Sequence, residues 1–126
     1  IKEYRGAAEK YVIRFPTGLI EEGESPEHAA ARELQEETGF VSENLESLGI
    51  LESTSGYYKG GALHVFYAKS IEQTGNMARE PAEEDMEVVF IPLEKAFRMA
   101  QQAEFEDIQT VYVILMLEKH LLQKSH

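Results

Sequence analysis

The sequence predicts an α/β fold, because segments that alternate like strands are interspersed with segments that have helical spacing. Strand patterns occupy Tyr11 to Phe15, Leu45 to Glu52 and Ala62 to Ser70, and a helical pattern runs from Pro26 to Thr38. The chain has 126 residues, 43% of them hydrophobic. This length suits one domain with its own core and is short for two. We therefore predict a single α/β domain over residues 1–126.

Charge and cysteine content narrow the range of functions. The net charge is −11 at pH 7, whereas non-specific nucleic-acid binding needs basic surface, so we expect no nucleic-acid partner. The absence of cysteine excludes a disulfide framework and a thiolate site, and it suits a cytoplasmic protein. The longest apolar run, Val111 to Leu117, is far shorter than the ~20 residues that a membrane span needs, so we expect none.

The stretch from Gly18 to Phe40 carries the strongest chemical signal. Ser25 before Pro26 is a helix-start signal, because serine can cap free backbone amides and proline fits the first helical position. Gly39 supplies the left-handed residue that often ends a helix. The pattern therefore predicts a helix from about Pro26 to Thr38.

Glu33, Glu36 and Glu37 stand at positions i, i+3 and i+4 of that helix and share an arc about 100° wide. Because like charges at this spacing repel one another, either the face is fully solvated or a cation sits on it. Carboxylates bind hard divalent cations, and the preceding glycine loop would allow backbone carbonyls to approach as further ligands. The spacing alone leaves both interpretations open.

The same stretch resembles the signature of the Nudix hydrolases, which is glycine, five residues, glutamate, seven residues, then Arg-Glu-apolar-x-Glu-Glu-x-Gly-apolar. Each specified position is filled: Gly18, Glu24, Arg32, Glu33, Leu34, Glu36, Glu37, Gly39 and Phe40. The resemblance implies the Nudix fold, an α/β/α sandwich with a mixed β-sheet. It also implies hydrolysis of phosphoanhydrides with Mg²⁺ or Mn²⁺.

The resemblance also assigns roles to residues around the helix. The carbonyl of Thr17 and the carboxylates of Glu33, Glu36 and Glu37 would be metal ligands, which gives Glu37 a catalytic role as well. Arg32 would pair with a neighbouring carboxylate and orient it. Glu24 would brace the loop against the helix rather than bind metal.

The general base is expected from the polar segment 71–87, which ends in acidic residues. In Nudix pyrophosphatases a glutamate of the loop before the last strand often acts as general base or as an extra metal ligand. Glu84 is our first choice and Glu83 the second, because the strand expected from Val88 to Pro92 fixes the end of the loop. A solvated acidic loop is the alternative.

Three residues are candidates for substrate binding. The Tyr4-Arg5 pair resembles one in ADP-ribose pyrophosphatases, where the arginine can reach the substrate; a surface arginine is the alternative. Tyr57 and Tyr58 lie in the loop between two expected strands and offer flat faces on which an adenine could stack, although tyrosines in loops more often serve packing.

The run from Phe15 to Ser25 and the polar loop before Val88 look most like the ADP-ribose pyrophosphatase branch, and within it like the ADP compounds hydrolases. These enzymes cleave ADP-ribose, NADH and diadenosine polyphosphates, with release of AMP. Where the branch usually has a proline, this chain has Ser55-Gly56. The alternatives are a house-cleaning nucleoside triphosphate pyrophosphatase and a non-catalytic module that binds ADP-ribose. The intact set of three glutamates argues against the non-catalytic module.

The resemblance further implies a homodimer, formed partly through N-terminal segments. The chain begins at Ile1 rather than at a methionine, which is compatible with a fragment that lacks its N-terminal strands. Towards the other end, helical spacing predicts two scaffold helices. Their apolar positions are Leu93, Ala96, Phe97 and Ala100 in the first, and Ile108, Tyr112, Leu115 and Leu122 within Glu106 to Gln123 in the second.

Overall fold

The computed structural model describes residues 1–5, 10–52, 61–75, 77–78 and 86–124, with the Arg5 side chain left out. In chain order the elements are β1 (Lys2–Arg5), β2 (Lys10–Ile13), α1 (Pro26–Thr38), β3 (Phe40–Val41), β4 (Leu45–Glu52), β5 (Ala62–Ala68), β6 (Glu72–Gln73), α2 (Leu93–Gln101) and α3 (Ile108–Lys124).

The strands of the described residues form antiparallel pairs, β1 with β2, β3 with β6 and β4 with β5. In the first pair Glu3 lies opposite Val12. In the third pair the register shifts between Ser47 and Gly49. A mixed sheet is therefore not seen within the described ranges.

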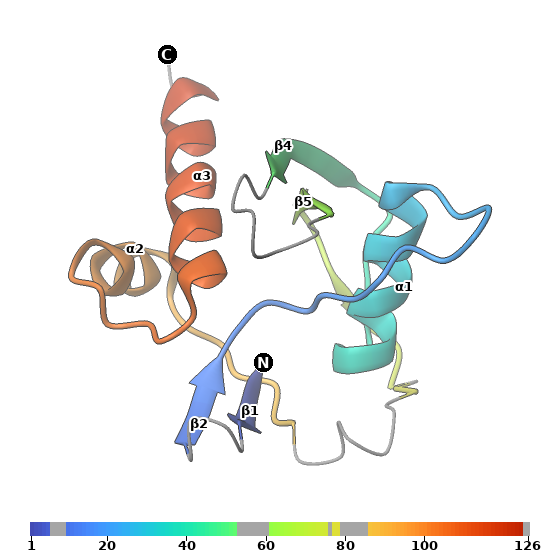
Figure 1. The fold of residues 1–126 in the computed structure, drawn as a ribbon, viewed down its shortest axis with the longest axis horizontal. Helices are drawn as coiled ribbons and strands as arrows, with labels where there is room; N and C mark the ends of the chain where they lie inside the picture. Colours follow the sequence, from blue (N-terminus) through green and yellow to red (C-terminus); the bar gives the residue numbers. More distant parts are fainter. Residues whose placement is uncertain (6–9, 53–60, 76, 79–85, 125–126) are drawn as a thin grey trace.

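Helices lie on both sides of the central strand pair. Figure 1 shows β4 and β5 between α1 on one side and α3 on the other, with α2 packed beside α3. This layering agrees with the α/β class and with the sandwich that the sequence predicts. The long loop that enters α1 lies on the side of the molecule away from the two C-terminal helices (Figure 1).

Most element bounds match the sequence patterns closely. The predicted bounds of α1 and β4 are confirmed without change. Strand β5 ends at Ala68, two residues early, and β2 covers Lys10–Ile13 rather than Tyr11 to Phe15.

The strand expected from Val88 to Pro92 is wrong. The backbone there makes only an isolated bridge at Glu87, whose N–H and C=O exchange hydrogen bonds of 2.9 and 2.8 Å with Lys2. Pro92 has no N–H, and no neighbouring strand among the described residues continues the ladder past this bridge. An apolar, β-branched run therefore does not become a strand without a pairing edge.

The face that α3 buries also differs from the expectation. Thr110 and Ile114 are its buried residues, whereas the four apolar residues singled out from the spacing are exposed: Ile108 (85%), Tyr112 (54%), Leu115 (41%) and Leu122 (58%). Because Val111 to Leu117 is apolar on every side, its periodicity cannot select the buried face.

The described core is small. Its buried hydrophobic residues come from several elements and loops: Ile1, Val12, Ala29, Val65, Met86, Ala100 and Ile114. Within the described ranges, no helix is both long enough and apolar enough to cross a lipid bilayer.

Candidate active site on helix α1

Local sequence signals fix both ends of α1. The Ser25 hydroxyl accepts a hydrogen bond of 3.1 Å from the His28 N–H, and Pro26 opens the helix. At the other end Gly39 has φ 75° and donates its N–H to the Gln35 carbonyl at 2.8 Å. Because these are the capping arrangements that serine and glycine favour, the helix begins and ends where the sequence predicts.

Gly18 brings the preceding loop against the helix. A Cβ atom at this position would lie 1.8 Å from Oε1 of Glu33, far inside contact distance. The absence of a side chain therefore lets the loop backbone and a carboxylate of α1 approach each other closely. Such an approach can gather backbone and carboxylate oxygens at one place.

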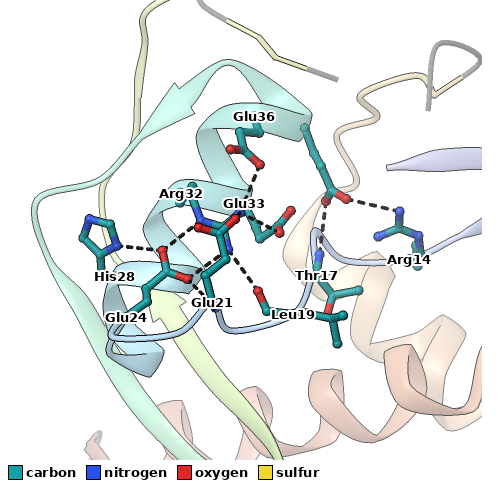
Figure 2. Close-up of polar contacts among 10 residues, drawn as sticks. Arg14, Thr17, Leu19, Glu21, Glu24, His28, Arg32, Glu33 and Glu36 are labelled. Carbon is teal, nitrogen blue, oxygen red and sulfur yellow. Dashed lines mark hydrogen bonds and ion pairs between the residues drawn. The ribbon is translucent and has the colours of Figure 1, made fainter. Parts of the chain in front are cut away.

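Arg32 connects the loop to the acidic face of α1. Its Nε and Nη2 donate to the two oxygens of Glu24 at 2.8 and 3.0 Å. Its Nη1 donates to Glu33 at 3.0 Å and to Glu36 at 3.2 Å, and Nη2 also reaches the Leu19 carbonyl at 3.0 Å. Figure 2 shows this guanidinium among the carboxylates. One arginine thus orients three glutamates and a loop carbonyl.

Glu24 is held as an anion by these contacts. The hydrogen bond from Arg32 is the largest cause that lowers its pKa to about 2, followed by the Glu21 N–H, which donates to it at 3.1 Å. The bond to Glu24 also raises the pKa of Arg32. The pair therefore stays ionised and ties the loop to the helix, the bracing role that the sequence suggests for Glu24.

Glu37 occupies a different environment, with only 1% of the residue exposed. The Thr17 N–H donates to its Oε2 at 3.1 Å, and Nη2 of Arg14 donates to its Oε1 at 3.3 Å. Figure 2 places Thr17 and Arg14 near each other, in the first part of the loop that leaves β2. A buried carboxylate of this kind is stable only when it is paired and hydrogen-bonded.

Comparison with known proteins identifies the family. A model of the NUDIX domain matches residues 1–114. The chain belongs to the Nudix family.

Two Nudix relatives extend over nearly the whole chain. It is 32% identical to the ADP-ribose pyrophosphatase of Bacillus subtilis (strain 168) over 98% of this chain and 66% of the relative. It is 29% identical to the ADP compounds hydrolase NudE of Escherichia coli (strain K12) over 96% of this chain and 63% of the relative. The chain therefore spans slightly less than two thirds of their lengths.

A solved structure agrees with this family assignment. The crystal structure of an ADP compounds hydrolase superimposes with a TM-score of 0.83 at 28% identity, over 98% of this chain and 65% of that one. The predicted Nudix fold is thereby confirmed.

The structure places some of the predicted Nudix site residues together and leaves others outside the described ranges. Thr17, Arg32, Glu33, Glu36 and Glu37 lie along the loop and α1, as the contacts above show. The remaining candidates lie outside what the structure describes. For Arg5 the backbone is described but the side chain is not, and four residues are not described at all: Tyr57, Tyr58, Glu83 and Glu84.

Two arginines donate to the three carboxylates of the Nudix helix. Glu33 and Glu36 accept hydrogen bonds from Arg32, whereas Glu37 accepts from Arg14. Two guanidinium groups therefore offset the repulsion among these three negative charges. Among the described residues no three acidic, histidine or cysteine side chains are arranged to hold a metal ion.

The chemistry of these donors nevertheless fits a hard divalent cation. Each side-chain atom that could coordinate a metal here is a carboxylate oxygen, the ligand type that Mg²⁺ and Mn²⁺ prefer. Gly18 also leaves the space beside Glu33 that a Cβ would fill, so loop and carboxylate oxygens can come together there.

Sequence reasoning missed Arg14 and Glu3. Nε of Arg14 donates to Glu3 at 2.6 Å, and Nη2 donates to the second oxygen at 3.3 Å. Burial lowers the pKa of Arg14, but the hydrogen bond to Glu3 and the charges of Glu37 and Glu3 outweigh it, so the pKa is raised overall. Arg14 lies in the strand pattern from Tyr11 to Phe15, where a charged residue usually faces solvent, and no pattern pointed to Glu3.

Proposed function

We propose that this Nudix domain hydrolyses the pyrophosphate bond of ADP-linked compounds, such as ADP-ribose, NADH and diadenosine polyphosphates, and releases AMP. The observation that carries the proposal is the set of glutamates on α1, held against a glycine loop by Arg32 and Arg14. The names of the two relatives, ADP-ribose pyrophosphatase and ADP compounds hydrolase, support the substrate class.

The proposal assigns metal binding to Glu33, Glu36, Glu37 and the carbonyl of Thr17. A bound Mg²⁺ or Mn²⁺ would neutralise phosphate charge and lower the pKa of a coordinated water. Arg32 keeps Glu33 and Glu36 from swinging into solvent, because its guanidinium is itself fixed by Glu24.

The roles of Glu84, Glu83 and Arg5 follow from the family resemblance, and those of Tyr57 and Tyr58 from the flat apolar face of tyrosine. Glu84, or Glu83 in its place, accepts the proton of the attacking water, a contribution of about 10²- to 10⁴-fold. Arg5 binds the phosphates, and Tyr57 and Tyr58 stack on the adenine. A homodimer stays a prediction of the same resemblance. A cytoplasmic location stays a prediction from the absence of cysteine, and a single domain over residues 1–126 one from the chain length.

The substrate class can be tested by incubating the protein with ADP-ribose, NADH, diadenosine triphosphate and dGTP, each with and without Mg²⁺. Chromatography would resolve AMP from the substrates. We expect Mg²⁺-dependent AMP release from the ADP-linked compounds and slower turnover of dGTP.

Each contrary outcome has its own meaning. Preferential turnover of dGTP would assign the domain to the nucleoside triphosphate pyrophosphatases. Binding of ADP-ribose without turnover would assign it to the non-catalytic binding modules. No turnover of any of the four substrates would refute the enzymatic proposal.

A further inference from the structure

Arg14 lies between two carboxylates that come from distant parts of the chain. Glu3 is on β1, Glu37 is on α1, and Arg14 directly follows β2. The side chains of Arg14, Glu3 and Glu37 are only 9%, 12% and 1% exposed. A buried group of one cation and two anions joins the N-terminal strand pair to the acidic helix.

The direction of the Arg14 guanidinium is set outside the Nudix signature. Glu3 holds it in a two-bond contact of 2.6 and 3.3 Å, and its Nη1 donates to the Phe15 carbonyl at 2.9 Å. A guanidinium is planar and rigid, so these bonds fix the direction of every N–H that it carries. Nη2, which donates to Glu3, also donates to Glu37.

The Glu37 carboxylate is held at both oxygens. Nη2 of Arg14 donates to Oε1 at 3.3 Å, and the Thr17 N–H donates to Oε2 at 3.1 Å. Donors at two different oxygens fix the plane of the carboxylate as well as its position.

We propose that Arg14, oriented by Glu3, is a positioning residue that fixes the Glu37 carboxylate for binding a divalent cation. The proposal rests on the metal-dependent function proposed above. Its action is through Glu37, and Arg14 itself contacts neither substrate nor cation. Partners that orient a metal ligand typically change metal affinity or activity by about 10- to 100-fold when they are removed.

A measurement of cation affinity separates positioning from simple charge repulsion, because removal of the guanidinium would change the affinity in opposite directions in the two cases. A nearby guanidinium that acts only by its charge repels a cation, so its removal would tighten binding. A guanidinium that orients the ligand favours binding, so its removal would weaken it.

Mn²⁺ affinity measured by isothermal titration or by electron paramagnetic resonance, without substrate, tests the proposal. We expect Arg14→Met to weaken Mn²⁺ binding about 10- to 100-fold. Arg14→Lys keeps the charge but loses the rigid fork, so we expect about a tenfold loss. Lys10→Met is the matched control, because Lys10 pairs with Glu106 at 2.6 Å in a half-exposed contact, and its Mn²⁺ affinity should equal that of the unaltered protein.

Thermal unfolding would establish that each variant is folded. Unchanged or tighter Mn²⁺ binding by folded Arg14→Met would overturn the proposal, as would unaltered affinity in Arg14→Lys. If Arg14→Met does not fold, Arg14→Lys alone decides, since it leaves no buried carboxylate without a cation nearby.

Turnover gives a second readout. Because Arg14 touches no substrate in this proposal, Arg14→Lys should lower kcat at saturating Mn²⁺ and leave KM for ADP-ribose unchanged. A raised KM with unchanged kcat would contradict it. If the unaltered protein binds Mn²⁺ but turns over none of the four substrates, the proposed function fails while the Mn²⁺ comparison still decides the role of Arg14.

Discussion

At the scale of single residues, the close approach of Gly18 to Glu33 is the tightest constraint in the site. The backbone φ of Gly18 is not in the positive range, so alanine at this position could adopt the same backbone conformation. The obstacle is space alone, since the new Cβ would lie 1.8 Å from the Glu33 carboxylate. The conflicting atom ends a flexible side chain, so the carboxylate would move and the fold would remain.

Gly18→Ala should therefore separate activity from stability. We expect kcat to fall on the order of 10²-fold, the scale reported for a misplacement of about 1 Å in an active site. The free energy of unfolding should change by less than about 1 kcal/mol. Steady-state kinetics and thermal unfolding would measure the two effects.

Gly61→Ala is the control, because a Cβ there would meet no atom within 4 Å among the described residues. It should leave both quantities unchanged. A Gly18→Ala variant with unaltered kcat would show that Glu33 does not need its present position.

The residues around this site differ in how well the sequence predicts them. Arg32 and Glu24 could be found because they stand at fixed distances along one loop and helix. Arg14 and Glu3 could not, because their contact with Glu37 depends on how β1, β2 and α1 meet in space. Spacing along the chain carries no information about such an encounter.

At the scale of elements, Glu46 ties β4 to the C-terminal helix. Its carboxylate contacts Nζ of Lys124 at 2.7 Å and Nζ of Lys69 at 3.0 Å. The hydrogen bond from Lys124 is the largest cause that lowers the pKa of Glu46 to about 2, and Lys69 is the next. The contact joins β4 to the last turn of α3 and to the segment that follows β5.

This shift predicts how stability depends on pH. The folded pKa of Glu46 is below its ordinary value of 4.5, so its stabilisation is complete above about pH 4.5 and is lost as the pH falls through about 2. The melting temperature of Glu46→Gln should therefore lie below that of the unaltered protein at pH 6. The difference should shrink as the pH is lowered from 4.5 towards 2.

Melting curves recorded from pH 2 to pH 7 would check this expectation. Glu94→Gln, which changes an exposed glutamate in the first turn of α2, is a suitable control for the loss of one surface charge. A difference for Glu46→Gln that grows in acid would contradict the assigned ion pairs.

The ends of an element can be predicted from the sequence where capping residues mark them. Helix α1 has a serine cap, a first-turn proline and a left-handed glycine, and both ends were predictable. The two-residue strands β3 and β6 were not, because their pairing depends on contact between Phe40–Val41 and Glu72–Gln73. For the same reason, the run from Val88 to Pro92 looks like a strand in sequence and is not one in space.

At the scale of the whole molecule, the fold serves to bring an N-terminal strand pair and a glycine loop against one acidic helix. Antiparallel pairing sets Glu3 and Arg14 beside α1, and the loop returns from β2 to the start of the helix. The family match over residues 1–114 and the TM-score of 0.83 fit this arrangement. Composition and periodicity predicted the α/β class, and the signature predicted the family.

The central claim is that Glu37 belongs to a metal-dependent site for pyrophosphate hydrolysis, and Glu37→Gln tests it most directly. Glutamine keeps the volume and can still accept from the Thr17 N–H, so the variant should fold with a melting temperature close to that of the unaltered protein. We expect its kcat for Mg²⁺-dependent AMP release from ADP-ribose to fall by about 10³-fold, the scale at which one electrostatic group contributes. Near-normal kcat in the folded variant would contradict the claim.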